Sequence, residues 1–522
     1  MRGDSAFAPS YGPATPTYML DIMLKDRIRL ASLLDKVMSP AEAASLIRDG
    51  MTVGMSGFTR AGDAKAVPLA LAERAATEPF GITLITGASL GNGIDEVLTR
   101  SHVLKRRLPF QSDRVLRAAL NKGEVMFIDQ HLSETVELLR SRQMGPIDVA
   151  VVEAVAITRE GGIIPTTSVG NSATFAILAE KVIIELNLGQ SADLEGLHDI
   201  YIPTRRPHRE PIPVITPDSR VGLPFIPIDP AKIAAIVVTE RVDSSAEATA
   251  PDDETRAIAG HLIEFLGSEV RKGRLTNRLG PLQAGIGSIA NAVLHGLIDS
   301  PFHDLTMYSE VLQDSTFELF DSGKLAFASG SSITLSAACQ ARVMPNIGQY
   351  KSRLVLRPQE VSNHPEVLRR LGVIAINTAL ECDIYGNVNS THVGGTHMMN
   401  GIGGSGDFAR NAYMGIFVTK SLAKDGSISR IVPMVPHVDH NEHDVDVVVT
   451  EIGLADLRGL APRERAEVII ANCIHPSYRE LAADYYRRAV REHGGQTPHL
   501  LAEAFSWHLR QEETGSMLPA VG

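Results

Sequence analysis

The sequence contains few cysteines. Among its 522 residues there are three, Cys339, Cys382 and Cys473, and no two of them have the C-x-x-C spacing of a redox or metal motif. This scarcity excludes a fold that depends on structural disulfides and predicts free thiols in a reducing compartment. We therefore expect a cytoplasmic protein.

Long apolar segments and basic clusters are also missing. No stretch approaches the length of uninterrupted apolar sequence that a transmembrane helix needs, so we predict no membrane partner. The formal net charge is −11 and there is no long basic run, which argues against nucleic acid as a partner. A small anionic ligand stays open, because a few local donors are enough to bind one.

The start of the chain lacks the pattern of a signal peptide. Residues 1–22 are rich in Pro, Ser, Tyr and Gly and contain no basic segment followed by an apolar core. We expect them to form a disordered N-terminal extension. The rest of the chain is too long for a single hydrophobic core, which predicts two or three domains.

What the sequence does contain is a repeated α/β alternation. A predicted strand at 51–55, a Gly-rich loop, a helix at 68–76 and a strand at 82–86 follow one another, and the order of loop, helix and strand recurs from Gly285. The Pro-rich stretch 202–230 separates the two blocks, and we interpret it as the inter-domain connection. Further strands are predicted at 125–128, 148–152, 181–186, 234–239, 305–308, 373–377, 416–418 and 445–450.

The predicted fold class is therefore α/β, with two related, open, mostly parallel domains that face each other across a cleft. The first spans residues 23–230 and the second spans residues 231–522, beginning with the strand at 234–239 and ending in a helical tail. In open parallel sheets, ligands bind beyond the carboxyl ends of the strands. The cleft between the domains is thus the expected site.

The most distinctive segment is a glycine-rich loop at residues 400–410 (NGIGGSGDFAR), in which four of the six residues 401–406 are glycine. Such a backbone can approach a ligand closely and offer N–H groups to an anion or an oxyanion. Gly401, Gly403 and Gly406 also match the dinucleotide fingerprint, but the polar, turn-rich segment before them does not provide the buried strand that this fingerprint requires. A structural glycine turn and a functional backbone site both stay open from this loop alone.

Two carboxylates occupy positions typical of α/β enzymes. Glu310 and Glu451 each follow a predicted apolar strand, although a solvated loop glutamate is the alternative in both cases. A desolvated carboxylate with nearby oxyanion donors can act as a covalent nucleophile, and the loops at 285–287 and 401–406 can supply such donors. The residues thus permit acyl transfer without identifying it.

Other reactive patterns are weaker. Residues 437–443 (HVDHNEH) contain three histidines and two carboxylates, but their spacing does not place the ligands on one helix face, and we predict no metal site. The segment from Gly403 to Asp407 approaches the serine-hydrolase pattern G-x-S-x-G, with Asp407 in the place of the second glycine. Cys339 and Cys473 lie in apolar helical segments, where burial is expected.

Taken together, six motifs resemble the acetyl-CoA hydrolase/transferase family, and within it the class I CoA-transferases that act on succinyl-CoA and acetate. They occur in order from about residue 23 to the C-terminus, at residues 56–59 (SGFT), 82–89 (ITLITGAS), 165–172 (PTTSVGNS), 308–314 (YSEVLQD), 398–410 (MMNGIGGSGDFAR) and 450–459 (TEIGLADLRG). The resemblance implies a CoA-transferase fold, a homodimer, and transfer of CoA from succinyl-CoA to acetate by a ping-pong mechanism. Coenzyme A is then a substrate, and no separate cofactor is expected.

The resemblance also implies roles for individual residues. Glu310 corresponds to the nucleophile that forms first an acyl-glutamyl anhydride and then a glutamyl-CoA thioester. Ile286 and Gly404 correspond to the oxyanion-hole amides, and Asn363 and Glu451 match further active-site positions. The family's CoA contacts correspond to Gly280, Pro281, Leu282, Gln283, Ala284, Asn400, Gly404 and Lys424.

Three alternatives accompany this reading. The same fold can carry an acyl-CoA hydrolase, in which water takes the glutamyl thioester, or a transferase that uses propionate or another small carboxylate. A non-catalytic CoA-binding regulator is a more remote alternative. Production of acetyl-CoA when acetate is supplied distinguishes a transferase from a hydrolase.

Overall fold

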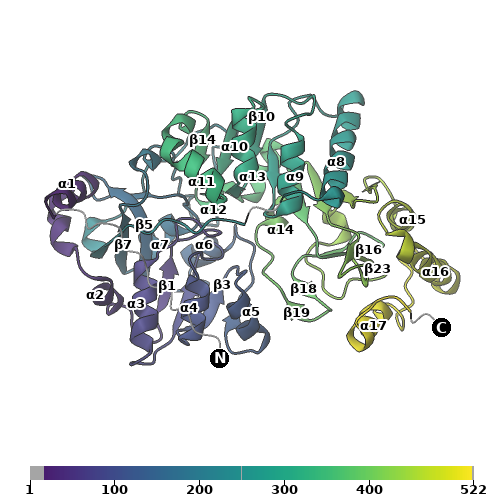
Figure 1. Ribbon diagram of the computed structural model, residues 1–522, viewed down its shortest axis with the longest axis horizontal. Helices are drawn as coiled ribbons and strands as arrows, with labels where there is room; N and C mark the ends of the chain where they lie inside the picture. Colours follow the sequence, from purple (N-terminus) through teal and green to yellow (C-terminus); the bar gives the residue numbers. More distant parts are fainter. Residues whose placement is uncertain (1–16, 248–249, 520–522) are drawn as a thin grey trace, which may run out of the picture.

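The computed structural model describes residues 17–247 and 250–519 and confirms the α/β class. Two domains each contain an eight-stranded, mostly parallel sheet with helices packed on it. In Figure 1 the first domain (purple to blue) lies on the left, and the second (teal to green) occupies the upper centre and right.

The first sheet has the strand order β4–β3–β2–β1–β5–β7–β8, and β6 pairs antiparallel with β5. The other neighbours are parallel. Its strands are β1 (Thr52–Met55), β2 (Ile82–Ile85), β3 (Leu104–Leu108), β4 (Met126–Phe127), β5 (Val149–Ile157), β6 (Ile163–Pro165), β7 (Lys181–Asn187) and β8 (Ile233–Thr239).

The second sheet has the order β14–β12–β10–β9–β15–β20–β24–β25, and only β25 runs antiparallel to its neighbour. Its strands are β9 (Leu282–Ala284), β10 (Leu305–Tyr308), β12 (Leu325–Gly330), β14 (Leu354–Leu356), β15 (Ile374–Thr378), β20 (Met414–Val418), β24 (Val447–Val449) and β25 (Leu454–Asp456). Strands β9, β10, β12 and β14 follow one another across this sheet as β1, β2, β3 and β4 do across the first. The repeat predicted from the sequence is thus confirmed as a shared strand order.

Helices connect the strands of both sheets. They are α1 (Thr17–Arg27), α2 (Pro40–Ala44), α3 (Ala66–Ala75), α4 (Ile94–Arg100), α5 (Arg114–Asn121), α6 (Thr135–Arg140), α7 (Ser172–Leu178), α8 (Asp253–Arg271), α9 (Ser288–Gly296), α10 (Asp314–Asp321), α11 (Ala337–Val343), α12 (Gln359–Ser362), α13 (Pro365–Leu371), α14 (Ser405–Asn411), α15 (Pro462–Asn472), α16 (Pro476–His493) and α17 (Ser506–Thr514). No helix within 17–247 and 250–519 combines the length and the hydropathy needed to cross a membrane.

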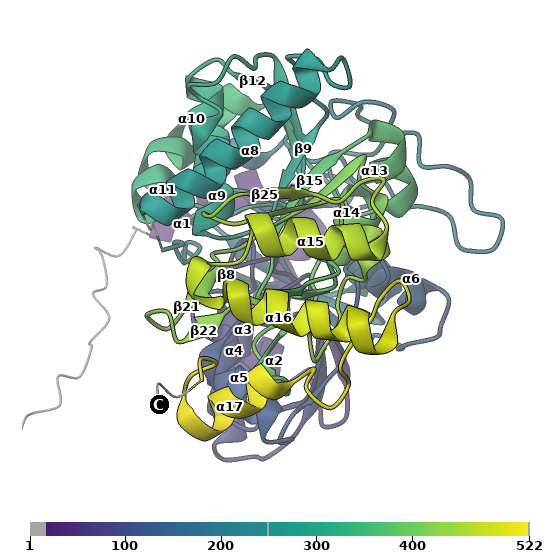
Figure 2. The same ribbon diagram turned by 90° about the vertical axis from the view of Figure 1, so that its right-hand side faces the viewer.

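Short strands and 3₁₀ helices complete the described part of the chain. The strands are β11 (Val311–Leu312), β13 (Ser332–Ile333), β16 (Glu381–Asp383), β17 (Val388–Asn389), β18 (His392–Val393), β19 (His397–Met398), β21 (Leu422–Ala423), β22 (Ile428–Ser429) and β23 (Ile431–Val432). The 3₁₀ helices are η1 (Ala31–Lys36), η2 (Ala192–Leu194), η3 (Pro230–Lys232), η4 (Met344–Tyr350) and η5 (Glu442–Asp444). The last three α-helices pack with β16, β17 and β23 around a separate hydrophobic core that includes Trp507, and Figure 2 shows them stacked on one side of the molecule.

The predicted domain boundary at residue 230 was wrong by one strand. β8 was expected to open the second domain, but it pairs in parallel with β7 and completes the first sheet. Its buried residues Ala235 and Val237 belong to a hydrophobic cluster made of first-domain residues, which is why the strand stays there. The Pro-rich stretch before it packs Ile212 and Val214 on the second domain and then returns.

The N-terminal prediction was partly wrong. Residues 1–16 of the expected disordered extension lie outside the described residues, but residues 17–22 belong to helix α1. Met23 and Leu24, further along this helix, pack against the large hydrophobic core that both domains share. The helix therefore has an apolar anchor that the composition of the first residues did not reveal.

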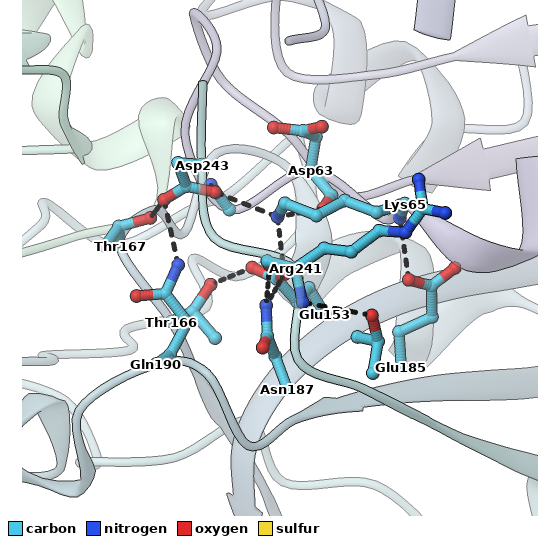
Figure 3. Close-up of polar contacts among 12 residues, drawn as sticks. Asp63, Lys65, Glu153, Thr166, Thr167, Glu185, Asn187, Gln190, Arg241 and Asp243 are labelled. Atoms are coloured by element: carbon cyan, nitrogen blue, oxygen red, sulfur yellow. Dashed lines mark hydrogen bonds and ion pairs between the residues drawn. The ribbon is translucent and has the colours of Figure 1, made fainter. Parts of the chain in front are cut away.

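A buried ionic cluster lies beyond the carboxyl ends of β1 and β8, with members in β5 and β7 (Figure 3). Lys65 Nζ is 2.6 Å from Glu153 Oε1 and 2.9 Å from Asp243 Oδ1, and all three side chains are buried. Burial raises the pKa of Glu153, while the ammonium of Lys65 opposes that rise. Asp243 also accepts a bond from the Gly62 amide at 3.1 Å, so the cluster braces the loop that follows β1.

Candidate active site

A cavity of about 950 Å³ is lined by residues of both domains. The first domain contributes residues of the loops after β1, β2 and β3, and the second contributes the loops after β9 and β10 and the glycine loop. These are carboxyl ends of parallel strands, where the sequence placed the site. Lining residues used below are Arg60, Phe110, Arg117, Ile286, Glu310, Asn400, Gly404 and Ser405.

Glu310 lies at the wall of this cavity, between the end of β10 and the start of β11. Its carbonyl accepts bonds from the amides of Ser331 (2.7 Å) and Ser332 (3.1 Å), which fixes the backbone under the side chain. Its Oε1 accepts a bond from Asn363 Nδ2 at 2.7 Å. Burial is the main reason that the pKa of Glu310 rises from 4.5 to about 7; the charge of Asp407 adds to the rise and Asn363 opposes it.

Asn363 is the hydrogen-bond partner that orients this carboxylate. It caps helix α12, donating its backbone N–H to Gln359 O at 2.8 Å. The Ser362 hydroxyl donates to Asn363 Oδ1 at 3.4 Å, an arrangement that directs the amide nitrogen toward Glu310. The same nitrogen lies 3.4 Å from Asp407 Oδ2, so one amide serves two carboxylates.

Gly404 lies against Glu310 at the start of helix α14. A Cβ built on Gly404 would be 1.9 Å from Glu310 Oε1 and 2.5 Å from Asn363 Nδ2. Glycine is therefore required here to bring the main chain onto the carboxylate. In residues 17–247 and 250–519, the amides of Gly404 and Ile286 donate to no other protein group, so both are free for a ligand.

First-domain residues hold the glycine loop and the two methionines that precede it. Asp129 accepts the Ile402 amide at 2.9 Å and 3.0 Å, and Asn121 exchanges two bonds with the backbone of Met398. Arg117 donates to the Met399 carbonyl. Figure 1 shows the elements involved, α5 and the β18–β19 hairpin, side by side. Sequence reasoning missed all of these first-domain residues, because their partners are more than 270 positions away.

The predicted site residues fall into two groups. Glu310, Asn363, Gly404, Ile286 and Asn400 lie at or directly behind the cavity wall. Asn400 Nδ2 donates to the Ser390 carbonyl at 3.2 Å, which holds its side chain at the rim. These five are the residues that the fold brings together.

The other predicted residues do not line the cavity. Gly280, Pro281, Leu282, Gln283 and Ala284 lead into or form β9, where Gln283 is buried and bonded to Asn377 at 3.1 Å. Lys424 is exposed in the β21–β22 turn. The carboxylate of Glu451 accepts bonds from the amide (2.8 Å) and the hydroxyl of Ser421, so it is already engaged within its own domain.

The histidine-rich segment 437–443 serves packing and hydrogen bonding. His437 pairs with Asp439 at 3.2 Å, and buried His440 lies 3.0 Å from the Ser405 hydroxyl. No group of three His, Cys, Asp or Glu side chains suited to a metal ion occurs in the portion of the chain with a described structure. All three cysteines are buried.

Arg60 and Phe110 are further cavity residues that the sequence reading did not select. Arg60 directly follows the motif at residues 56–59, and this position could have identified it as a candidate site residue. Phe110 lies under the glycine loop, since a Cβ built on Gly401 would be 3.1 Å from its ring. It follows β3 and has no motif of its own.

Comparison with known proteins identifies the family of the chain. Models of the acetyl-CoA hydrolase/transferase N-terminal and C-terminal domains match residues 23–238 and 340–486. The chain is 49% identical over 493 residues to the succinyl-CoA:acetate CoA-transferase of Clostridium kluyveri, covering 94% of this chain and 92% of that protein. It is 45% identical to the propanoyl-CoA:succinate CoA transferase of Escherichia coli, with 92% and 98% covered. It is also 45% identical to the acetyl-CoA hydrolase of Candida glabrata, with 95% and 97% covered.

Solved structures share the fold at lower identity. RipA from Yersinia pestis superposes with a TM-score of 0.68 at 21% identity, covering 91% of this chain and all of that one (100%). The 4-hydroxybutyrate CoA-transferase from Porphyromonas gingivalis gives a TM-score of 0.61 at 22% identity, with 90% and 99% covered. At these identities the likeness concerns the fold alone.

Proposed function

The chain belongs to the acetyl-CoA hydrolase/transferase family and is an enzyme, and from that premise we propose that it transfers CoA from succinyl-CoA to acetate. The observation that carries the proposal is the half-buried carboxylate of Glu310, which faces a cavity between Asn363 and the main chain of Gly404. A carboxylate so placed is a nucleophile for a thioester carbonyl.

The proposed reaction begins when ionised Glu310 attacks the succinyl thioester. The C–S bond breaks, and an acyl-glutamyl anhydride and CoA thiolate form. The thiolate then attacks the glutamyl carbonyl, releasing succinate and leaving a glutamyl-CoA thioester. Acetate attacks this thioester, displacing CoA thiolate, and the thiolate attacks the acetyl carbonyl of the new anhydride to give acetyl-CoA and free Glu310.

Backbone amides stabilise the negative oxygen that forms in each addition step. The Gly404 amide is in the loop against Glu310, and the Ile286 amide lines the same cavity; neither is used by another described group. Loss of one such donor typically costs about 2.7–4 kcal/mol of transition-state stabilisation. Coenzyme A, in this proposal, is a substrate held in the cavity and no separate cofactor takes part.

Hydrolysis of acetyl-CoA is the second candidate function, because the relative from Candida glabrata bears that name at 45% identity. In that reaction, water takes the glutamyl thioester in place of acetate. Propionate is a further candidate substrate, since the Escherichia coli relative is named for propanoyl-CoA. The three reactions differ in the acceptor that the cavity binds, which is acetate, water or propionate.

Two measurements test the proposal. Purified protein is incubated with succinyl-CoA and ¹³C-acetate, and labelled acetyl-CoA is expected to form faster than free CoA is released. Free CoA without labelled acetyl-CoA would indicate a hydrolase instead.

Borohydride added during turnover is expected to reduce the thioester at Glu310. Mass spectrometry of the peptide that contains Glu310 detects this reduction, and Glu310→Gln is the control. An unmodified peptide during active turnover would contradict the glutamyl intermediate.

A further inference from the structure

Asp407 is a buried carboxylate behind the nucleophile. Its Oδ2 lies 3.4 Å from Asn363 Nδ2, and the same nitrogen lies 2.7 Å from Glu310 Oε1. Asp407 is 4% exposed and Asn363 is fully buried. The amide of Asn363 is thus fixed between two carboxylates, only one of which faces the cavity.

The other bonds of Asp407 come from the first domain. Ser133, in the connection between β4 and α6, donates its amide at 3.0 Å and its hydroxyl at 2.6 Å to the two oxygens of Asp407. His131 lies beside them, because a Cβ on Gly406 would be 2.3 Å from its ring. Asp407 belongs to helix α14 of the second domain, whereas Ser133 belongs to the first. The position of Asp407 therefore depends on how the first domain packs against the second.

From this geometry we infer that Asp407 is a positioning residue: anchored by Ser133 across the domain interface, it holds Asn363 in the orientation that presents the Glu310 carboxylate to the cavity. The inference rests on the proposed role of Glu310 as nucleophile. Packing of the first domain against the second therefore helps to orient the nucleophile. The same contact fixes helix α14, which begins directly after Gly404.

The charged groups around Glu310 and Asp407 predict how the pKa of Glu310 changes when Asp407 is replaced. Glu310 faces Asp407 and Asn363, and Asp407 faces Ser133, Asn363 and His131. The negative charge of Asp407 raises the pKa of Glu310, whereas the Asn363 amide lowers it. Removing the Asp407 charge should therefore make Glu310 easier to ionise while loosening its orientation.

The test compares Asp407→Asn with wild type. The variant is expected to lose about tenfold or more in kcat, because the carboxylate of Glu310 is less well oriented. KM for acyl-CoA should change by less than about threefold, because Asp407 does not line the cavity. The acidic limb of kcat/KM is expected to move to lower pH. A purely structural role would lower Tm and activity but leave this limb in place, so an unmoved limb or a wild-type kcat overturns the inference.

Two further variants complete the design. Asp484→Asn is the matched control, since it makes the same change at an exposed carboxylate on α16, away from the cavity; its acidic limb should coincide with that of wild type. If Asp407→Asn does not fold, Ser133→Ala removes only the hydroxyl bond and should still lower kcat severalfold at unchanged KM. An unchanged kcat in folded Ser133→Ala would overturn the inference.

These results are separable from failure of the proposed function. Glu310→Gln should abolish turnover whether the enzyme is a transferase or a hydrolase, and the pH profile can be recorded with either reaction. If Glu310→Gln retains activity, the nucleophile assignment fails. If Glu310→Gln is inactive but the Asp407→Asn limb does not move, only the positioning role fails.

Discussion

The main chain of Gly404 lies so close to the carboxylate of Glu310 that a single added carbon would overlap it, at 1.9 Å from Oε1. The two residues are on different loops of the second domain, one after β10 and the other leading into α14. Because of this proximity, the Gly404 amide and the Glu310 carboxylate can contact the same group of a bound substrate. In the proposed reaction, one donates to the oxyanion while the other attacks.

Substitution of Gly404 by alanine should inactivate the enzyme while leaving the fold intact. The methyl group would displace Glu310 or Asn363, and the Gly404 amide would move away from the oxyanion. We expect kcat to fall about 100-fold or more, measured with succinyl-CoA and acetate.

Gly260→Ala is the control for this change. Gly260 lies in helix α8, and a Cβ there meets no atom within 4 Å. The control should retain full activity and gain about 1 kcal/mol of unfolding free energy from helix propensity. Equal activity of the two variants would mean that the close approach at Gly404 is not needed.

Loss of the Asn363 amide should shift the pH dependence of catalysis upward. The 2.7 Å bond to Glu310 stabilises the ionised carboxylate and lowers its pKa. In Asn363→Ala, the pKa of Glu310 should rise, and the acidic limb of kcat/KM should move to higher pH, opposite to Asp407→Asn. We expect kcat to fall about 10- to 100-fold. Asn346→Ala, at an exposed asparagine, is the control and should show the wild-type profile.

Glu310 should reduce the stability of the folded protein above neutral pH. Burial raises its pKa to about 7 from an ordinary 4.5, so the folded state resists losing a proton that the unfolded chain gives up readily. Below pH 4.5 both states hold the proton, and no penalty arises; the penalty grows between about pH 4.5 and 7 and is complete above pH 7. Glu310→Gln should therefore be more stable than wild type at pH 8, on the order of 1–3 kcal/mol, and similar to it at pH 4.

Denaturant unfolding at the two pH values measures this difference. A variant that is equally stable at both pH values relative to wild type would show that the Glu310 carboxylate is not held in a desolvating site. Glu318→Gln, on α10, serves as a control because that side chain is exposed.

Lys65 should be essential for the first domain. Its Nζ neutralises Glu153 and Asp243 in a fully buried cluster, so Lys65→Met leaves two carboxylates without their cation. We expect a loss of about 3–5 kcal/mol in unfolding free energy. The loss should be larger at pH 8 than at pH 5, because burial raises the pKa of Glu153 and its protonation relieves the buried charge.

Lys181→Met provides the comparison for this cluster, since Lys181 is exposed at the start of β7 in the same domain. It should change stability by no more than about 0.5 kcal/mol. A Lys65→Met protein with wild-type stability would show that the buried pairs contribute nothing net.

Much of the fold was readable from the sequence because it depends on local patterns. The strand at 82–86 and the recurrence of loop, helix and strand at Gly285 both appear close to their predicted positions. The boundary at 230 failed because β8 and the second-domain strands have the same apolar composition. Only pairing with β7 reveals which sheet β8 joins.

By itself, the sequence determined the family and the α/β class, because contiguous motifs carry the first and the alternation of strands and helices carries the second. The same motifs selected Glu310 and Gly404 as candidate site residues. Tertiary structure alone decided which residues meet: Asp407 with Ser133, Ile402 with Asp129, and Asn363 with Glu310. It also showed that Glu451 and Lys424 lie outside the cavity lining. Spacing along the chain does not predict such contacts, because they join loops that are far apart in the sequence, either between the two domains or within the second.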